Sequence, residues 1–512
     1  LCLRSKKLDV RLAFDLCTEE TNFLQKRKKF VASALKKALN LEQDLQDHEV
    51  PVVAVMTTGG GTRALTSLLG NLLGLQKLGL LDAVSYITGS SGSTWTLSHL
   101  YQSSDWSHED LSGPIGEVRR HMTKCKLSCF SLESFKYYDK ELKLRKQEGY
   151  QTSSVDFWGL LLEKALNDGK NDHKLSDERQ ALDQGQNPLP IYMILNMKER
   201  YSLPEFKEWV EFTPYEVGFL KYGAFIRAED FGSQFFMGRL MKKLPESRIC
   251  FMQGDMLIKV CTQPRAVNVE QVPFLPTQNN ELETYLVTPE CGIMDIIRQL
   301  LTKRVLVSKF FNFLKGLQLH NEYLQSKNFC IWKDTVLDNF PNQLTQTTEF
   351  LCLADTAGYI DISYPPLMRP QRKVDIISDF SPLEKASKYF LKQGIPFPKI
   401  HLSDEEESNL KECYIFEDRE TPQAPIVVFF PLVNDTFRTY KEPGVERGPS
   451  ELAQGDVDVS SSASPYCINS FTYTEEEFDK LVKLTSYNIQ NNKHLILQAL
   501  KSAVEHKKQQ KK

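Results

Sequence analysis

The sequence predicts an α/β fold in which a mixed central sheet is flanked by helices. Two short apolar runs, at 50–56 and 84–88, are each followed by a glycine-rich turn and then by residues suited to a helix. A third apolar run, at 350–354, ends at a carboxylate, Asp355. Since ligands and catalytic groups of open α/β sheets gather at the carboxyl ends of strands, we expect a site at these three turns.

Helices are also predicted at both ends of the chain. Thr18 can act as the N-cap of a helix that reaches toward Leu39, with acidic residues in its first turn. Thr474 and Glu477 have the spacing of a capping box. The last helix has an apolar stripe formed by Ile496, Ala499, Leu500, Ala503 and Val504.

The first turn holds three consecutive glycines, Gly59, Gly60 and Gly61, between the strand at 50–56 and a helix. The helix is predicted from the i, i+3, i+4, i+7 spacing of Leu65, Leu68, Leu69 and Leu72. Glycine amides can approach a ligand closely, and a helix N-terminus favours a developing oxyanion or a phosphate. Nucleotide binding is an alternative, but no Gly-Lys-Ser/Thr closes a P-loop and the Gly-x-Gly-x-x-Gly pattern is missing.

The second turn, at 89–93, contains Gly-x-Ser-Gly-Ser. In such an elbow the chain reverses sharply from strand to helix, and small residues at Gly89 and Gly92 leave the hydroxyl of Ser91 exposed. A motif this short is more often an ordinary Ser/Gly turn, but the glycine turn upstream favours a catalytic role. Ser91 is the candidate nucleophile.

A serine nucleophile needs a base, and none of the nine histidines has a convincing setting. His401 opens an acidic run, His506 lies in a basic tail, His494 begins the last helix, and His99 follows the elbow on its own helix. Asp355 stands instead at the end of a strand among small residues. An aspartate in that place more often caps a turn, so both roles remain open for it.

Composition predicts a large cytoplasmic protein. The chain has 512 residues, of which 41% are hydrophobic, so it can bury an ample core, and its length alone suggests two or more domains. Eleven cysteines without a Cys-x-x-Cys pair indicate reduced thiols. No run reaches the roughly 18 apolar residues of a membrane span. The start of the chain does not resemble a signal peptide.

The net charge is only −3, so any electrostatic attraction to anionic lipid must be local. Candidate basic clusters are 26–29, Lys143 with Arg145 and Lys146, Lys242 with Lys243, Arg369 with Arg372 and Lys373, and the tail at 507–512. Such clusters are more often solvated helix faces. Nucleic acid is excluded as a partner, because acidic residues outnumber basic ones and no binding motif occurs.

Longer motifs carry a family resemblance. They are Gly59-Gly60-Gly61-Thr62-Arg63, the elbow through Trp95, and the segments 209–218, 221–225, 231–238 and 364–372. In their order along the chain and in their residue identities they resemble the catalytic domain of group IV cytosolic phospholipase A2 over almost the whole chain. They are more similar to the beta, delta, epsilon and zeta branch than to the alpha enzyme, and most similar to delta.

The resemblance implies a patatin-like hydrolase core of mixed sheet and helices with an inserted cap or lid. It implies a dyad of Ser91 and Asp355 without histidine, oxyanion-hole amides at Gly60 and Gly61, and contact of Arg63 with the substrate phosphate. A cation at a helix start is otherwise out of place, unless Arg63 pairs with an internal carboxylate. The implied reaction hydrolyses the sn-2 acyl ester of a glycerophospholipid through an acyl-serine. Lysophospholipase, acyltransferase or a non-catalytic lipid-binding scaffold are alternatives.

The resemblance also predicts the organisation of the chain. Residues 1–15 would be a linker or the end of a C2 domain, 16–512 the catalytic domain, and about 256–350 the cap. Calcium is expected to act through a C2 domain absent from this chain, and no metal is expected at the catalytic residues. The expected location is the cytosolic face of a phospholipid membrane. The aromatic block at 209–236 is expected to be core, with some residues lining an acyl cleft.

Overall fold

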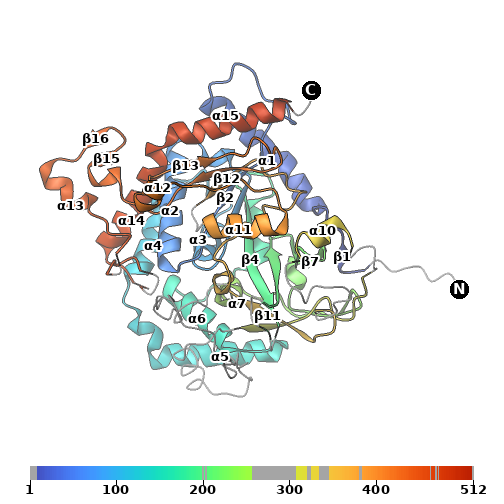
Figure 1. Ribbon diagram of the computed structural model, residues 1–512. Coiled ribbons are helices and arrows are strands. Elements are labelled where there is room, and N and C mark those ends of the chain that lie inside the picture. The colour runs from blue at the N-terminus through green and yellow to red at the C-terminus, as the bar shows by residue number, and fades with distance from the viewer. Residues whose placement is uncertain are drawn as a thin grey trace, which may run out of the picture.

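The structure is a computed structural model that describes residues 8–198, 201, 205–255, 307–319, 325–333, 345–379, 383–461, 463–467, 470 and 472–509. In these residues a twelve-stranded sheet lies at the centre, with α15 at the top of the view and α5 and α6 at the bottom (Figure 1). The predicted α/β class, with a mixed sheet and flanking helices, is therefore confirmed.

The strand order is β1-β7-β6-β5-β4-β3-β2-β12-β14-β13, and β11 pairs with both β4 and β10. The strands are β1 Arg11–Leu12, β2 Val53–Met56, β3 Tyr86–Gly89, β4 Leu189–Met197, β5 Lys207–Phe212, β6 Glu216–Phe219, β7 Ala224–Arg227, β10 Ser308–Phe311, β11 Phe350–Ala354, β12 Ile376–Asp379, β13 Tyr414–Phe416 and β14 Ile426–Phe429. Two hairpins stand apart from the sheet: β8 Gln234–Phe236 with β9 Arg239–Lys242, and β15 Tyr440–Glu442 with β16 Val445–Glu446.

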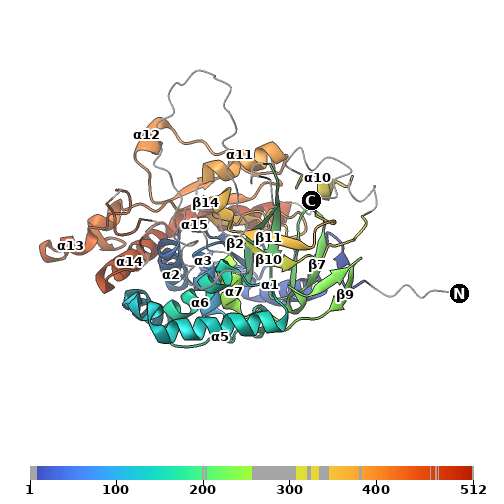
Figure 2. The same cartoon turned by 90° about the horizontal axis from the view of Figure 1, so that it is seen from below.

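The longer helices are α1 Thr18–Ala38, α2 Thr62–Lys77, α3 Ser93–Leu100, α4 Ser112–Thr123, α5 Leu132–Glu148, α6 Ser154–Leu166, α11 Leu383–Gln393, α14 Glu475–Asn491 and α15 Lys493–Gln509. The short ones are α7 Ile249–Asp255, α10 Lys327–Cys330, α12 Asp404–Ser408 and α13 Leu452–Gly455. Figure 2, turned by 90°, shows α5 along the lower edge of the molecule, with β9 beyond one of its ends. No described helix is both long and apolar enough to cross a membrane.

Five neighbouring strands, β4, β3, β2, β12 and β14, are parallel, so their carboxyl ends lie at one edge of the sheet. These strands are almost entirely buried, as the continuous apolar runs predict. The helix α2 packs against α14 and α3, and α6 packs against α5 and α7. The turns after β2 and β3, which carry the two glycine motifs, therefore emerge side by side.

The local predictions hold with one shift. Thr474 caps α14 in a capping box with Glu477, and the stripe on α15 is buried. The helix α1, however, is capped by Cys17, whose Sγ accepts from the amide of Glu20 at 3.4 Å, so Thr18 is its first residue and the N-cap prediction was wrong.

Most of the predicted cap or lid insertion at 256–350 lies outside the described residues. The described cysteines form no disulfide with one another.

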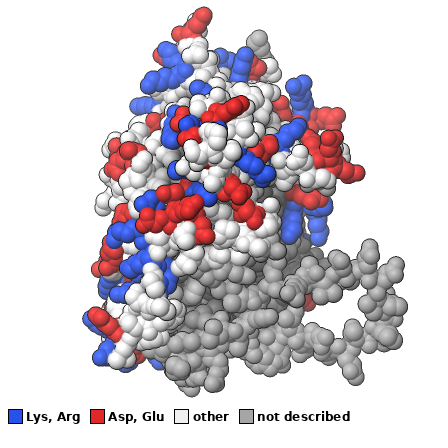
Figure 3. Space-filling view, turned by 90° about the vertical axis from the view of Figure 1, so that its left-hand side faces the viewer, with Lys and Arg blue, Asp and Glu red and all other residues white. Residues whose placement is uncertain are grey.

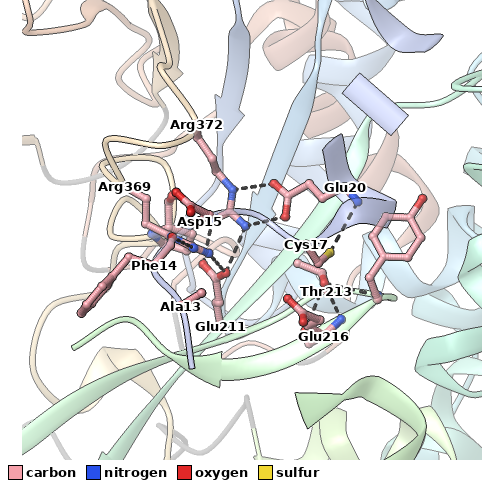
Figure 4. Close-up of polar contacts among 12 residues, drawn as sticks. Ala13, Phe14, Asp15, Cys17, Glu20, Glu211, Thr213, Glu216, Arg369 and Arg372 are labelled. Atoms are coloured by element: carbon pink, nitrogen blue, oxygen red, sulfur yellow. Dashed lines mark hydrogen bonds and ion pairs between the residues drawn. The ribbon is translucent and has the colours of Figure 1, made fainter. Parts of the chain in front are cut away.

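Both arginines of the predicted basic cluster of Arg369, Arg372 and Lys373 are buried, whereas Lys373 is exposed. Arg372 is fully buried, and its Nη1 donates to Oε2 of Glu211 at 2.7 Å while its Nε donates to Oε1 of Glu20 at 2.9 Å (Figure 4). Arg369 also pairs with Glu211 and is buried. An arginine can be buried when its planar fork is fully paired with carboxylates.

Two other arginines from the predicted clusters are buried as well. Arg27 is 0% exposed and donates to the backbone carbonyl of Val84 at 2.9 Å. The Nε of Arg145 donates to Oδ1 of Asp156 at 2.6 Å in the interior. In both clusters the exposed cations are lysines, because a lysine ammonium is more strongly hydrated.

The network around Arg372 joins α1, β5 and the chain between β11 and β12. Burial alone would raise the pKa of Glu20, but the charges of Arg372 and Arg369 and the hydrogen bonds from Arg372 and Tyr86 together outweigh burial and lower that pKa. Burial alone would lower the pKa of Arg372, but Glu20 and Glu211 raise it well above its ordinary value. Each charge is thus held in its ionised form by its partners.

We expect Arg372→Met to lower the free energy of unfolding by about 3–5 kcal/mol, because it leaves Glu20 buried without its ion-pair partner and Glu211 with Arg369 alone. Denaturant unfolding measures this loss. Lys388→Met is the control, since it removes one partner of an exposed pair with Glu384 and should have little effect. Similar small effects of both changes would contradict the role of the network.

Candidate functional site

Strands β3 and β11 end head to head along the same edge of β4. Gly89, the last residue of β3, pairs with Tyr192, whereas Ala354, the last residue of β11, pairs with Leu195. The other edge of β4 is occupied by β5, so both strands must lie on the first edge. Three residues of extended chain separate the two strand ends, roughly 10 Å. The residues that follow the two strands, Ser91 and Asp355, therefore leave the sheet toward the same small region.

Ser91 lies at the sharp turn between β3 and α3. Its φ of 50° is in the left-handed region, which is uncommon for a residue with a side chain and is typical of strained functional turns. Its carbonyl accepts from the amide of Thr94 at 3.1 Å and from the Oγ1 of the same residue at 2.6 Å. The predicted strand-to-helix elbow is therefore present in the backbone.

Ser91 as a whole residue is only 4% exposed, because the glycine turn lies against it. A Cβ on Gly59 would come within 2.6 Å of the Cβ of Ser91, and a Cβ on Gly92 would overlap the carbonyl oxygen of Gly61. The two turns are packed backbone against backbone, and only glycine leaves room for this contact.

The glycine turn presents backbone amides beside the elbow. Gly60 and Gly61 have φ values of 129° and 62°, which favour glycine. The amide of Gly59 donates to Oδ1 of Asp361 at 2.9 Å, whereas the amides of Gly60 and Gly61 donate to no protein group in the described part of the chain. The helix α2 begins at Thr62, so its N-terminus adds positive potential here.

Asp355 is buried, at 4% exposed, directly after β11. Its Oδ1 accepts from the amide of Ala357 at 2.9 Å, so it caps the short 3₁₀ helix Thr356–Gly358. The turn-capping role left open for this residue is thus real. That hydrogen bond fixes the carboxylate where the chain leaves the sheet.

The segment that follows Asp355 is hydrogen-bonded to the glycine turn and to the strand β3 that leads into the elbow. The Oγ of Ser363 donates to the carbonyl of Thr57 at 2.6 Å and lies 2.7 Å from the Oγ1 of Thr88. Asp361 binds the glycine turn through the amide of Gly59. Sequence reasoning missed Thr57, Asp361 and Ser363. The signal for Asp361 and Ser363 is the alternation of polar and apolar residues after Gly358, which is too short to be specific, and Thr57 is marked only by its place after the apolar run at 50–56.

A cavity of about 450 Å³ opens beside the glycine turn. Its lining includes Gly59, Arg63, Ala357, Asp361 and Lys385, but neither Ser91 nor Asp355. Arg63 is half-buried, and no carboxylate among the described residues lies within ion-pair distance of it. The alternative that Arg63 pairs with an internal carboxylate therefore finds no support in the described residues. Arg63, Lys385 and the N-terminus of α2 favour an anion in this cavity, and the carboxylate of Asp361, which also lines it, accepts from the amide of Gly59.

Three of the described histidines lie beside acidic residues and not beside Ser91. His99 lies 3.5 Å from Glu117, and burial lowers its pKa. His108 contacts Asp82 and Asp105, and His506 lies 3.3 Å from Glu417. In the ranges that the structure describes, no group of three or more His, Cys, Asp or Glu side chains could hold a metal ion.

Comparison with known proteins gives the family. A family model described as "Lysophospholipase catalytic domain" matches residues 53–258. Human cytosolic phospholipase A2 epsilon is 53% identical, over 98% of this chain and 62% of the relative. A solved structure, human GIVD cytosolic phospholipase A2, is 45% identical with a TM-score of 0.88, over 98% of this chain and 69% of that chain. The chain belongs to the group IV cytosolic phospholipase A2 family.

Two further facts come from these comparisons. The chain spans about 62% of the length of the epsilon relative, and identity to that relative is higher than the 45% to the human delta relative that the motifs favoured. A second solved GIVD structure, 42% identical over 98% of this chain and 66% of that chain, with a TM-score of 0.80, is a complex with methyl gamma-linolenyl fluorophosphonate.

The contact between the two turns gives a test of the site geometry. We expect Gly92→Ala to cost about 1–3 kcal/mol of stability, because its methyl group overlaps the Gly61 carbonyl, and to lower ester hydrolysis by roughly a hundredfold. Unfolding and turnover on a soluble ester measure the two effects. Gly113→Ala, in α4, is the control, because a Cβ there meets nothing within 4 Å. Equal activity of the two variants would show that the contact does not position the site.

Proposed function

We propose that this chain is the catalytic part of a phospholipase that hydrolyses the sn-2 fatty-acyl ester of glycerophospholipids at a membrane surface. The observation that carries the proposal is the head-to-head meeting of β3 and β11, from which Ser91 and Asp355 emerge. Family membership supports the class of reaction. The products are a free fatty acid and a lysophospholipid.

In the first half of the reaction, the Oγ of Ser91 attacks the ester carbonyl and its proton passes to Asp355. An aspartate in water, with a pKa of about 3.9, is a poor base for an alcohol, so the base has to be desolvated and aimed. The burial of Asp355 and the amide of Ala357 on its Oδ1 provide such a setting. Asp355 then protonates the leaving glycerol oxygen, and the acyl-serine remains.

In the second half, water attacks the acyl-serine and gives its proton to Asp355. As the bond between the acyl carbon and the Oγ of Ser91 breaks, Asp355 returns that proton to Oγ, so the serine hydroxyl and the carboxylate of Asp355 are restored and the fatty acid is released. Both tetrahedral intermediates carry an oxyanion. We assign the hydrogen-bond donors to this oxyanion as the amides of Gly60 and Gly61. Their lack of protein acceptors in the described chain and the N-terminus of α2 support that role.

Arg63 is proposed to bind the substrate phosphate. It lines the cavity beside the glycine turn together with Lys385, and it is the second residue of α2, whose first turn has no acidic residue. A phosphate in that cavity would face both cations and the helix N-terminus. The headgroup would thereby fix the position of the ester relative to Ser91.

Lysophospholipase activity is a second candidate, because the matching family model carries that description. Transfer of the acyl group to another acceptor would need only a different nucleophile in the second half of the reaction. A lipid-binding scaffold without catalysis is the alternative from another class. The fluorophosphonate complex of the GIVD relative supports a reactive serine over a silent scaffold.

Calcium is proposed to act on recruitment, through a C2 domain outside these 512 residues, and not on the catalytic residues. The enzyme would act from the cytosol as a peripheral protein at the cytosolic face of a membrane, where anionic lipids would strengthen its binding.

We expect Ser91→Ala and Asp355→Asn each to lower phospholipid hydrolysis by a factor of about a thousand or more, because the members of one catalytic unit are not additive. Turnover on detergent-dispersed phospholipid is the measurement, with thermal unfolding to check the fold. His99→Ala is the matched control on the same elbow helix and should keep most activity. A thousandfold loss in a folded His99 variant would replace the dyad with a triad.

Substitutions of Arg63 separate binding of phosphate from an effect on the fold. Arg63→Lys keeps the charge but loses the planar fork, so it should retain more activity on phospholipid than Arg63→Ala. On a neutral ester without phosphate both variants should match the parent within about threefold, since no anion is there to bind. Equal losses on both substrates would remove Arg63 from headgroup binding.

A further inference from the structure

Three large apolar side chains are exposed within six residues where α4 leads into α5. Leu127 is 78% exposed, Phe130 53% and Leu132 74%. Leu127 and Phe130 belong to the 3₁₀ helix Lys126–Phe130, and Leu132 begins α5. Single exposed apolar residues are ordinary on a soluble protein, but such a group marks a surface with a partner.

The fold holds these side chains outward. Between them Cys129 is buried, and its carbonyl accepts from the hydroxyl of Tyr138 at 2.9 Å. The carbonyl of Ser128 accepts from the Oγ of Ser134 at 2.7 Å. The backbone of this turn is thus tied to α5, and the apolar side chains project from a fixed support.

The exposed side of α5 continues this surface with positive charge. The lysines Lys136, Lys140, Lys143 and Lys146 are exposed along the helix, and Lys124 is exposed just before the 3₁₀ helix. The acidic residues between Lys124 and Lys146 that are not buried are Glu133 and Asp139, and Asp139 is paired with Lys143 at 2.6 Å. From Lys124 to Leu132 there is no acidic residue. We call this surface, from Lys124 to Lys146, the α5 face.

The local excess of positive charge is unlike the rest of the chain, whose net charge is −3. On the side of the molecule shown in Figure 3, acidic and basic side chains are interspersed over most of the described surface. The α5 face also lies on the side toward which the β4 arrow points in Figure 1, which is the side of the carboxyl ends of the parallel strands.

From these features we infer that the α5 face docks on an anionic phospholipid bilayer, with Leu127, Phe130 and Leu132 entering the interface. Lysines around a few inserted apolar side chains are typical of interfacial membrane binding. A protein partner fits less well, since lysine is depleted in protein interfaces. The inference rests on the proposed function, because the bilayer carries the phospholipid substrate.

Two paired variants test the apolar and the basic parts of the α5 face in the 512-residue chain. The first, Leu127→Ser with Leu132→Ser, is matched by Val445→Ser with Leu452→Ser, which are 42% and 51% exposed at another place. The second, Lys136→Glu with Lys140→Glu, is matched by Lys29→Glu with Lys37→Glu, two exposed lysines of α1. Each control changes hydrophobicity or charge by a comparable amount.

Sedimentation with vesicles of phosphatidylcholine and phosphatidylserine measures binding. We expect both α5-face variants to bind at least about tenfold more weakly than the parent, since one surface lysine is worth roughly fivefold in partition. Both controls should stay within about twofold of the parent. The parent should bind pure phosphatidylcholine vesicles more weakly than vesicles that contain phosphatidylserine. On pure phosphatidylcholine the Lys136→Glu, Lys140→Glu variant should bind as the parent does.

Hydrolysis of detergent-dispersed phospholipid is measured in parallel, and all four variants should match the parent. Parent-like vesicle binding by the α5-face variants, or no binding by the parent, would overturn the docking surface and leave the proposed reaction standing. Absence of hydrolysis in a parent that binds vesicles through the α5 face would instead overturn the proposed reaction.

Discussion

The candidate site depends on the contact between two turns that have no room for side chains. Gly59 lies against Ser91, and Gly92 lies against the carbonyl of Gly61. This contact is made of backbone, which changes position less readily than side chains. The elbow and the glycine turn therefore behave as one unit, and the amides of Gly60 and Gly61 keep a fixed relation to Ser91. Preorganised donors of this kind stabilise a developing oxyanion without reorganisation.

The candidate base is brought to this unit by tertiary structure. β11 enters from the far end of β4, and the segment after Asp355 is tied by Asp361 to the glycine turn and by Ser363 to Thr57 and to Thr88 of β3. Further on, the same segment ends at the buried cluster around Arg372. A buried ion cluster contributes little net stability against an apolar replacement, but it strongly penalises displacement of any one member. We therefore regard it as a device that fixes the position of the chain from Asp355 to Arg372.

Local parts of the fold and the site could be predicted because their signals lie within a few residues. The leucine spacing of α2, the capping box at Thr474 and the elbow around Ser91 depend only on helix period and glycine conformation. The burial of Ser91 could not be predicted, because it results from contact with a turn about thirty residues upstream. The pairing of Arg372 with Glu20 and Glu211 was missed for the same reason. A run of basic residues has the same sequence pattern whether it is solvated or neutralised from distant strands.

The central claim is that Ser91 is the reacting nucleophile and that the surrounding turns activate it. Peptide mass spectrometry after reaction of the folded chain with a long-chain fluorophosphonate tests it most directly, because the reagent forms a stable adduct with an activated serine. The account predicts a single adduct per chain, on the peptide that contains Ser91, and none after unfolding in denaturant. An adduct on another serine, or equal labelling of Ser91 in the folded and unfolded chain, would contradict it.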